Sequence, residues 1–277
     1  MILCEVKKLG KVLAVIGVGN MARAIVTGID RSSVNVDSVW LYDKVVAQYD
    51  MLECGRLNIV RAESIESAVS RADIVLISVK PQNYDDALSE IVKSCGYSEK
   101  LYISIGAGIT SESVSSRLGG ADVIRVLPNV PILIGKGVSV ICENLSVGRE
   151  NFEFVCSIFS AAGSNIVIDE SEMNRMIGVT SSSPAYVFKF IDSIYKGAIS
   201  QGLDNKDILD SICDVLIGSA LLLKNSSDTP EELIAKVASK GGTTERALAK
   251  LDEYGFEEAV VEAMIACTKR ADELGKL

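Results

Sequence analysis

Two glycine-rich stretches stand directly before helical patterns, and each leaves bare backbone where a helix begins. The first, Gly17-Val18-Gly19-Asn20-Met21-Ala22, follows the β-branched run 12–16. In the strand–turn–helix form GxGxxA, the first glycine allows the tight turn, the second lets the backbone approach a pyrophosphate, and the small alanine lets the helix pack on the strand. The helix N-terminus then offers free N–H groups to phosphate. The motif predicts a phosphate-binding turn, although such turns also occur as purely structural features.

The next predicted strand, within 38–44, ends in Asp43, which stands 21 residues after Ala22. An acid at about this spacing binds the ribose hydroxyls of a dinucleotide, so the context favours the nucleotide-binding interpretation. The carboxylate of Asp43 would repel a 2′-phosphate, whereas the ammonium of Lys44 could pair with one. The two residues together favour NADH slightly and leave NADPH open.

The second stretch, ASKGGTTERAL at 238–248, precedes an amphipathic run near the end of the chain. Gly241 and Gly242 can present successive backbone N–H groups with no side chain in the way. Thr243 and Thr244 would begin a helix, so their N–H groups lack partners within it. Spare donors at a helix N-terminus can bind an anion. Glycine and threonine are also common N-caps, and the stretch taken alone favours plain capping.

The composition restricts the chemistry further. The 277 residues include no histidine, which excludes Ser-His-Asp and Cys-His nucleophiles and His-ligated metal sites, and we expect no metal centre. Seven scattered cysteines without a CxxC pair are typical of reduced thiols in a cytoplasmic protein. A net charge of −9 argues against nucleic acid as a partner. No apolar run is long enough for a membrane span, and the N-terminus lacks the apolar region of a secretion signal.

The elements that would position these groups change character along the chain. Near-continuous apolar runs lie within 12–16, 38–44, 72–82, 100–110 and 121–131, and helical patterns such as 84–95 separate them. Alternation of this kind is typical of a parallel sheet with helices on both faces. We therefore predict a doubly wound, Rossmann-type α/β domain over residues 1–167.

After SNIVIDESE at 164–172 the pattern becomes helical throughout. A long helix over 172–201, interrupted at SSSP, is followed by further helical patterns at 205–225, 229–239, 243–254 and 256–274. Pro230 stands at a plausible first helical position after Thr229. Helices that are apolar on more than one face need extra cover, so residues 168–277 predict an all-helical domain that packs against a second subunit.

Several stretches together resemble the pyrroline-5-carboxylate reductase family. In the family's order they are IGVGNMARAI at 16–25, ISVKP at 77–81, ISIGAGI at 103–109, RVLPNVP at 125–131, SSSPAY at 181–186 and SKGGTTERAL at 239–248. The resemblance implies an NAD(P)H-dependent oxidoreductase that reduces 1-pyrroline-5-carboxylate to L-proline, the last step of proline biosynthesis. It also implies a cofactor domain and a helical domain that forms a homodimer, often within a larger homo-oligomer.

The resemblance adds two segments to the cofactor site, 79–81 and 107–108, on the nicotinamide side. Either could have a structural role instead, the first as a strand end and the second as a turn into a helix. The predicted cofactor-binding residues are Gly17, Gly19, Asn20, Met21, Ala22, Asp43, Lys44, Val79, Lys80, Pro81, Ala107 and Gly108.

With the resemblance, the second stretch favours a site for the substrate carboxylate over plain capping. Hydride addition to the C=N carbon requires a proton on nitrogen, and the Thr244 hydroxyl is the candidate hydrogen-bond partner or proton donor. Glu170, at the head of the long helix, could stabilise an iminium or orient a water, or it could serve only the helix dipole. The candidate substrate-binding residues are Gly241, Gly242, Thr243, Ser182 and Ser239.

Both serines in that set have a structural alternative, since Ser182 could bond only to the helix backbone and Ser239 could cap the glycine loop. If the helical halves of two subunits intertwine, residues from both subunits could share one site.

Two departures from the family pattern leave other functions open. Ser181 and Ser183 stand where the family usually has glycines, and Lys240 stands where it usually has proline. These changes could be harmless, could shift the substrate, or could mark a nucleotide-binding regulatory pseudoenzyme. The other alternative is a related β-hydroxyacid or imine dehydrogenase, with Lys189 on the long helix as catalytic lysine, although its surroundings do not match that pattern.

Overall fold

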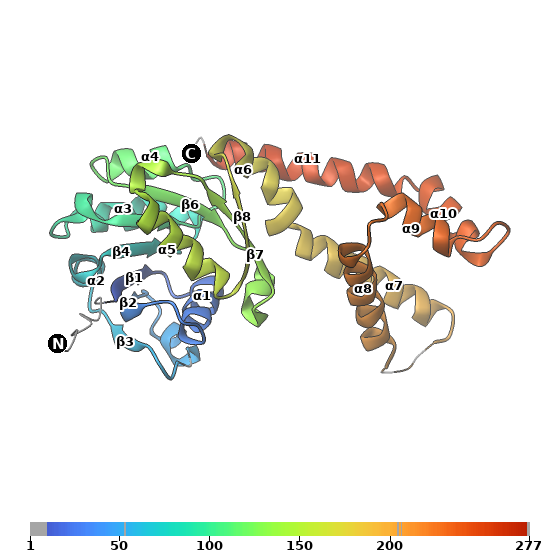
Figure 1. Ribbon diagram of the computed structural model, residues 1–277, viewed down its shortest axis with the longest axis horizontal. Coiled ribbons are helices and arrows are strands. Elements are labelled where there is room, and N and C mark those ends of the chain that lie inside the picture. The colour runs from blue at the N-terminus through green and yellow to red at the C-terminus, as the bar shows by residue number, and fades with distance from the viewer. Residues whose placement is uncertain (1–9, 53, 204, 206, 276–277) are drawn as a thin grey trace, which may run out of the picture. The chain divides into compact units, whose positions relative to one another are not determined.

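The structure is a computed structural model that describes residues 10–52, 54–203, 205 and 207–275. By their contacts these residues form two compact units, which Figure 1 labels by element. The first unit contains residues up to 182 together with those from 267 onward, and the second contains residues 183–266. The domain boundary at 167/168 stays a prediction, since contacts group residues 168–182 with the sheet.

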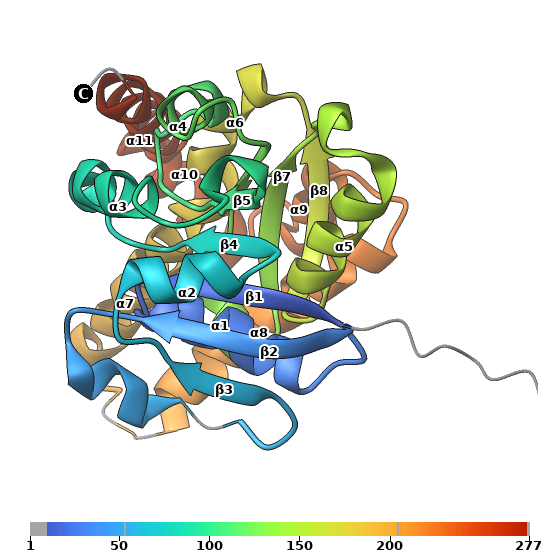
Figure 2. The ribbon, with the colours of Figure 1, turned by 90° about the vertical axis from the view of Figure 1, so that its left-hand side faces the viewer.

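The first unit is built on one eight-stranded sheet in the order β3-β2-β1-β4-β5-β6-β7-β8. Figure 2 shows strands β1 to β5 side by side. Because β1 to β6 are all parallel and the chain reverses its direction of travel after β3, the predicted doubly wound fold is confirmed. The strands are β1 (Lys11–Ile16), β2 (Val36–Tyr42), β3 (Asn58–Arg61), β4 (Ile74–Ile77), β5 (Leu101–Ser104), β6 (Val123–Leu127), β7 (Gly137–Cys142) and β8 (Gly163–Ile168).

The predicted parallel sheet extends from β1 to β6, and two further strands that the sequence analysis did not identify add one antiparallel pairing. Strand β7 pairs antiparallel with β6, and β8 pairs parallel with β7. The connection from β6 to β7 is the short 3₁₀ helix η4 (Val130–Ile134), which is too short for the crossover that a parallel neighbour requires. The chain therefore turns back on itself there.

Helices cover both faces of the sheet. Helices α1 (Asn20–Asp30) and α5 (Arg149–Ser160) pack on one face against side chains such as Val15, Val39 and Leu76. The other face carries α2 (Ile65–Arg71), α3 (Tyr84–Ile91) and α4 (Ser111–Arg117). Further 3₁₀ turns are η1 (Val46–Met51), η2 (Pro81–Asn83), η3 (Tyr97–Glu99) and η5 (Leu145–Val147).

A third, smaller cluster joins the end of the sheet to helices that come from beyond it. It contains Leu127, Val140, Met173, Ile177 and Ala271, all of which are buried. Helix α6 (Glu170–Met176) supplies Met173, and the last turns of α11 (Phe256–Leu274) supply Ala271. The C-terminal end of the chain is thus part of the first unit, which the sequence pattern did not indicate.

The predicted long helix exists, and its irregular part is a π-helical turn, η6 (Ile177–Ser181), between α6 and α7 (Ser183–Ser200). The Ser182 N–H donates to the Ile177 carbonyl (2.8 Å), one residue further back than in an α-helix. Pro184 follows at the start of α7, where its missing N–H costs little. Such turns are frequent at functional sites.

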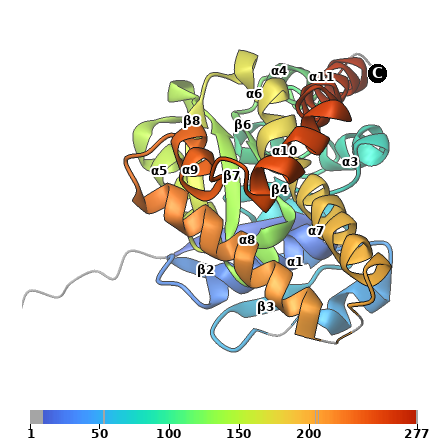
Figure 3. The same cartoon turned by 90° about the vertical axis from the view of Figure 1, so that its right-hand side faces the viewer.

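The second unit is all-helical, as predicted, and Figure 3 labels its helices. It contains α7, α8 (Asp207–Asn225), α9 (Pro230–Val237), α10 (Thr243–Glu253) and most of α11. Pro230 is at the start of α9, as expected, and the Thr229 side chain accepts the Glu232 N–H in a reciprocal capping box.

This second unit has almost no interior of its own. Of its described residues only Ile212 is buried, whereas apolar side chains such as Phe188, Val215, Ile217 and Leu222 are about half exposed or more. A unit of this size cannot fold stably with so little apolar surface removed from water. The helices therefore present apolar faces that a second polypeptide must cover.

Candidate active site

The turn between β1 and α1 has the geometry that its glycines predict. Gly17 has a φ of +91°, and a Cβ at that position would lie 2.9 Å from the backbone of Ser78. A side chain would therefore be both strained and obstructed there. At Gly19 a Cβ would meet nothing within 4 Å, so the backbone faces open space. Ala22 is fully buried in the core cluster under α1, which confirms its predicted packing role.

The N-terminus of α1 suits an anionic group. Its N-cap is Gly19, no side chain caps the helix, and no acidic residue lies in the first turn. The first N–H groups are thus left for a ligand, and the helix dipole favours negative charge there. An open glycine backbone beside an uncapped helix fits the pyrophosphate of a dinucleotide.

Asp43 follows β2 and is tied to this turn. Its Oδ2 accepts the Val18 N–H (2.7 Å) and its Oδ1 accepts the Val45 N–H (2.8 Å). The structure therefore brings Asp43 together with the glycine turn, although its bond to a ribose stays a prediction. Lys44 is exposed, and its ammonium lies 3.8 Å from the carboxylate of Asp86.

The remaining predicted cofactor residues lie at the ends of β4 and β5. Val79 borders the turn, since a Cβ on Gly17 would lie 3.0 Å from its Cγ1. Lys80 is exposed and precedes Pro81, which begins η2. Ala107 is half-buried beside the third cluster. Contact with a nicotinamide stays a prediction for all of them.

Gly108 has a packing role that the sequence did not indicate. Its φ is +79°, and a Cβ there would lie 2.7 Å from the Ala271 carbonyl and 2.9 Å from the Leu274 side chain. The loop after β5 can therefore lie close to the end of α11 only with glycine at this position.

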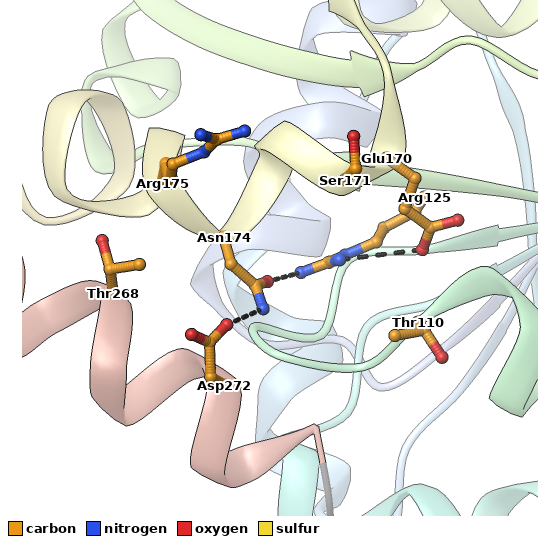
Figure 4. Close-up of a pocket in the computed structure, with 8 residues that line it drawn as sticks. All are labelled: Thr110, Arg125, Glu170, Ser171, Asn174, Arg175, Thr268 and Asp272. Atoms are coloured by element: carbon orange, nitrogen blue, oxygen red, sulfur yellow. Dashed lines mark hydrogen bonds and ion pairs between the residues drawn. The ribbon is translucent and has the colours of Figure 1, made fainter.

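A polar network around the buried Arg125 joins β6, α4, α6 and the end of α11, and Figure 4 shows its members Arg125, Glu170, Asn174 and Asp272. The guanidinium of Arg125 donates to Asn174 Oδ1 (2.6 Å) and lies 3.7 Å from Glu170 Oε1. Asn174 Nδ2 in turn donates to Asp272 Oδ1 (2.7 Å). Glu170 also accepts the Ser111 N–H (2.7 Å) and the Ser111 hydroxyl. The predicted catalytic acid is thus held at the N-terminus of α4.

The network borders a pocket of about 440 Å³, and the polar and charged residues that line it are Thr110, Arg125, Glu170, Ser171, Asn174, Arg175, Thr268 and Asp272. Burial lowers the pKa of the Arg125 guanidinium, and Glu170 opposes that shift. Burial also raises the pKa of the neighbouring Cys142 thiol to about 11, with a further contribution from Glu170. Cys142 is therefore protonated near neutral pH and unsuited to act as a nucleophile.

Sequence reasoning assigned no role to Arg125, Asn174 or Asp272. One signal was available, because Arg125 is the only charged residue in the buried strand VIRVL, and a charge in such a strand requires a partner. Its side chain is 1% exposed. The partners could not be found from spacing, since Asn174 and Asp272 are 98 residues apart.

The loop before α10 has the features of the predicted carboxylate site. Gly241 has a φ of +76°, and Gly242 is the N-cap without any side-chain cap. The Gly241 N–H donates to Glu245 (2.8 Å) and the Gly242 N–H to the Ser239 carbonyl (2.9 Å), which fixes the loop. The N–H groups of Thr243 and Thr244 point out of the first turn without helical partners. Gly242 is itself the N-cap, so this geometry agrees both with capping by glycine and with an anion site, and the carboxylate site stays a prediction.

Ser182 and Ser181 lie at the π-helical turn. The Ser182 hydroxyl lies 3.2 Å from the Cys267 thiol, a partner that the sequence did not suggest. The Ser181 hydroxyl is buried without a hydrogen-bond partner among the described residues. Ser182 and Glu170 belong to the first unit, whereas the Ser239 to Thr244 loop belongs to the second.

Two features are absent from the part of the chain that the structure describes, a metal-binding cluster and a membrane-spanning helix. No group of three or more His, Cys, Asp or Glu side chains there could hold a metal ion. No helix there is long and apolar enough to cross a membrane.

Comparisons with known families match both parts of the chain. The family described as pyrroline-5-carboxylate reductase dimerisation matches residues 170–274. The family described as NADP oxidoreductase, coenzyme F420-dependent, matches residues 12–108.

Individual relatives match along almost the whole length. Pyrroline-5-carboxylate reductase of Escherichia coli K12 is 35% identical over 272 residues, which are 96% of this chain and 99% of the relative. The enzyme of that name from Corynebacterium melassecola is 30% identical over 267 residues, which are 95% of this chain and 98% of the relative. Among solved structures, Plasmodium falciparum pyrroline carboxylate reductase with NADP bound has a TM-score of 0.86 and 26% identity. The match covers 96% of this chain and 99% of the Plasmodium chain.

Proposed function

This chain belongs to the pyrroline-5-carboxylate reductase family, and on that premise we propose which of its residues perform the family's reaction. It is an oxidoreductase that uses NADH or NADPH to reduce the C=N bond of 1-pyrroline-5-carboxylate to L-proline. The observation that carries this function is the 35% identity over 96% of the chain to an enzyme of that name.

The dinucleotide binds at the turn between β1 and α1. This placement is supported by the open backbone at Gly19 and by the uncapped N-terminus of α1. Asp43 would accept the ribose hydroxyls, and the segments 79–81 and 107–108 would border the nicotinamide. When bound, the reduced nicotinamide supplies the hydride that adds to the C=N carbon.

The substrate carboxylate binds at the N-terminus of α10. Support comes from the fixed backbone of Gly241 and Gly242 and from the absence of a side-chain cap on that helix. An anion there would accept the free N–H groups of Thr243 and Thr244. Positioning the small ring in this way supplies much of the acceleration, because the reacting atoms are then held at a fixed separation.

The nitrogen of the substrate must gain a proton as the hydride adds to carbon. Thr244 is half-buried, and its hydroxyl is our candidate for the hydrogen bond or proton to that nitrogen. Glu170 would act as a fixed negative charge that favours an iminium, since Arg125 and Ser111 hold its carboxylate in place. Ser182 would assist the substrate only by leaving Cys267.

The protein assembles as a homodimer through its helical domain. The exposed apolar side chains of α7, α8 and α11 are the surfaces that a second copy would cover. We extend this to two finer proposals, that the dimers form a larger homo-oligomer and that the enzyme works in the cytoplasm, as its unpaired cysteines suggest.

The test is an assay of NADH or NADPH oxidation at 340 nm with 1-pyrroline-5-carboxylate. We expect substrate-dependent oxidation that Thr243→Glu abolishes, because the new carboxylate would occupy the site of the substrate's own. Dinucleotide binding without any turnover in the wild type would instead support the regulatory pseudoenzyme, to which Ser181 and Ser183 point. Oxidation of hydroxyacids in place of the imine would support the dehydrogenase alternative.

A further inference from the structure

Asp43 carries a negative charge that is held in place from three sides. Both of its carboxylate oxygens accept backbone N–H groups, those of Val18 (2.7 Å) and Val45 (2.8 Å). The Tyr49 hydroxyl brackets the Asp43 backbone, accepting its N–H (2.5 Å) and donating to its carbonyl (3.1 Å). Tyr49 is itself buried. The side chain therefore has one defined position at the carboxyl end of β2.

The carboxylate cannot rotate away without a cost to the turn. Val18 is 1% exposed, so its N–H has no access to solvent and would lose its only acceptor if Asp43 moved. An unpaired buried N–H is strongly unfavourable. A ligand whose negative charge lies next to the ribose would therefore be repelled by the carboxylate and would not displace it.

The two nearby cations have partners other than Asp43. Lys44 pairs with Asp86 on α3 (3.8 Å). Arg23, the cation nearest the turn, donates to the Val18 carbonyl (3.4 Å) and also to Gln48 and Asn20. Among the described residues neither cation contacts the Asp43 carboxylate, and Arg23 would have to give up its present partners to bind a phosphate. The Lys44 pair is exposed and contributes little, so Asp43 is the charge that has a fixed position at this end of β2.

We propose that Asp43 makes this enzyme select NADH over NADPH. Each Asp43 oxygen has one lone pair left to accept a ribose hydroxyl, which suits the 2′-OH of NADH. The 2′-phosphate of NADPH carries roughly two negative charges at neutral pH and would meet a carboxylate that cannot withdraw. The Plasmodium falciparum relative was solved with NADP, so this chain would differ from it in preference.

The inference rests on the proposed function only for the identity of the cofactor, and binding without substrate tests it. We would measure the dissociation constants of NADH and NADPH by calorimetry for the wild type, Asp43→Asn and Asp37→Asn. Asparagine at 43 keeps an acceptor for the Val18 N–H while removing the charge. Asp37 is an exposed acid on the same strand, so its variant is a matched control for net charge.

We expect the wild type to bind NADH at least about tenfold more tightly than NADPH. Asp43→Asn should bring the two constants within about threefold of each other by improving NADPH binding, and Asp37→Asn should leave their ratio unchanged. Equal or tighter binding of NADPH by the wild type would overturn the proposal. So would an unchanged ratio in a folded Asp43→Asn protein.

A measurement on the wild type alone covers the case in which Asp43→Asn fails to fold. Raising the salt concentration to about 1 M shortens the Debye length to about 3 Å and screens the repulsion. The preference for NADH should then shrink severalfold, and a preference that salt does not change would refute the role of the charge. If the protein prefers NADH in binding but does not turn over the substrate, the proposed reaction is contradicted and the proposed role of Asp43 is not.

Discussion

Arg125 is the residue on which the interior of the first unit depends most. It is the largest side chain that is fully buried, and it links strand β6 to α6 and, through Asn174, to Asp272 on α11. Its Nε has no partner among the described residues. A buried cation of this kind is stable only while its counter-charge and acceptors stay in place.

Replacing Arg125 by methionine should therefore destabilise the protein strongly. Glu170 and the Asn174 carbonyl would lose their common partner, and we expect a loss of about 3 kcal/mol in the free energy of unfolding, measured by thermal melting at fixed protein concentration. The exposed ion pair of Arg149 with Glu153 provides the control, and Arg149→Met should leave the melting temperature unchanged. Equal effects of the two variants would contradict the central role of Arg125.

A substitution at Ser181 should increase the stability of the protein. Its hydroxyl is buried without a hydrogen-bond partner in the part of the chain that the structure describes, so Ser181→Ala should raise the free energy of unfolding by about 1 kcal/mol. Ser104 is also buried, but its hydroxyl bonds to the Tyr84 hydroxyl (3.0 Å), so Ser104→Ala should lower stability instead. Thermal melts of the two variants should shift in opposite directions. A lower melting temperature for Ser181→Ala would mean that the hydroxyl has an acceptor, such as an ordered water.

At the scale of elements, the loop before α10 is more constrained than its sequence suggests. A Cβ on Gly242 would lie 2.6 Å from Ser239 Oγ and 2.9 Å from the Ser239 carbonyl. Gly242→Ala should therefore shift the loop and raise KM for 1-pyrroline-5-carboxylate about tenfold, while the dissociation constant of NADH stays the same. Gly55→Ala is the control, since a Cβ there meets nothing. An unchanged KM for Gly242→Ala would remove this loop from the substrate site.

The sequence predicted elements better than it predicted their connections. The apolar runs of β1, β4, β5 and β6 identified those strands, because strands buried on both faces need nearly continuous apolar side chains. The edge strand β3 was missed, since its residues Asn58–Arg61 are only partly buried. Strand β7 was not predicted either, and its antiparallel pairing with β6 could not have been read from the sequence, because the side-chain pattern of a strand is the same in either direction.

In the candidate site, too, some features could be predicted from the sequence and others could not. The turn at Gly17 and Gly19 was predictable because a local φ and a local clearance decide it. The Arg125 network was not, because its members come from four elements that are distant in the sequence, β6, α4, α6 and α11. A conformation that neighbouring residues decide can therefore be predicted from the sequence. Of a pairing between distant residues, the sequence shows only one sign, an isolated charged residue in an apolar run.

At the scale of the whole molecule, folding and association must be coupled. The second unit has one buried residue among those described, Ile212, and its helices carry exposed apolar side chains along their length. Its stability therefore has to come from the partner subunit, and the melting temperature should rise with protein concentration. Scans over a hundredfold range of concentration would measure this. A melting temperature independent of concentration would show that the helical unit is stable without a partner.

In the dimer, one catalytic centre could be formed by residues of one chain or of both chains. Dimers that contain two different variants can distinguish these two arrangements. Gly19→Glu places a charge in open space at the α1 N-terminus, and Thr243→Glu places one at the exposed start of α10, so each should fold and block one anion site. If the two sites that work together come from different subunits, a mixed dimer contains one intact pair and one doubly blocked pair.

Refolding the two inactive variants together should then restore roughly a quarter of the wild-type rate, because about half of the dimers are mixed and each mixed dimer has one working centre. If both anion sites of a working centre belong to one chain, every centre in the mixture carries one block and no activity returns. Refolding each variant alone is the control, and gel filtration must show the same oligomeric state in all three samples. A restored rate would mean that the exposed apolar helices bring two chains together to complete the catalytic centre, so that an isolated subunit would have neither a stable helical unit nor an active site.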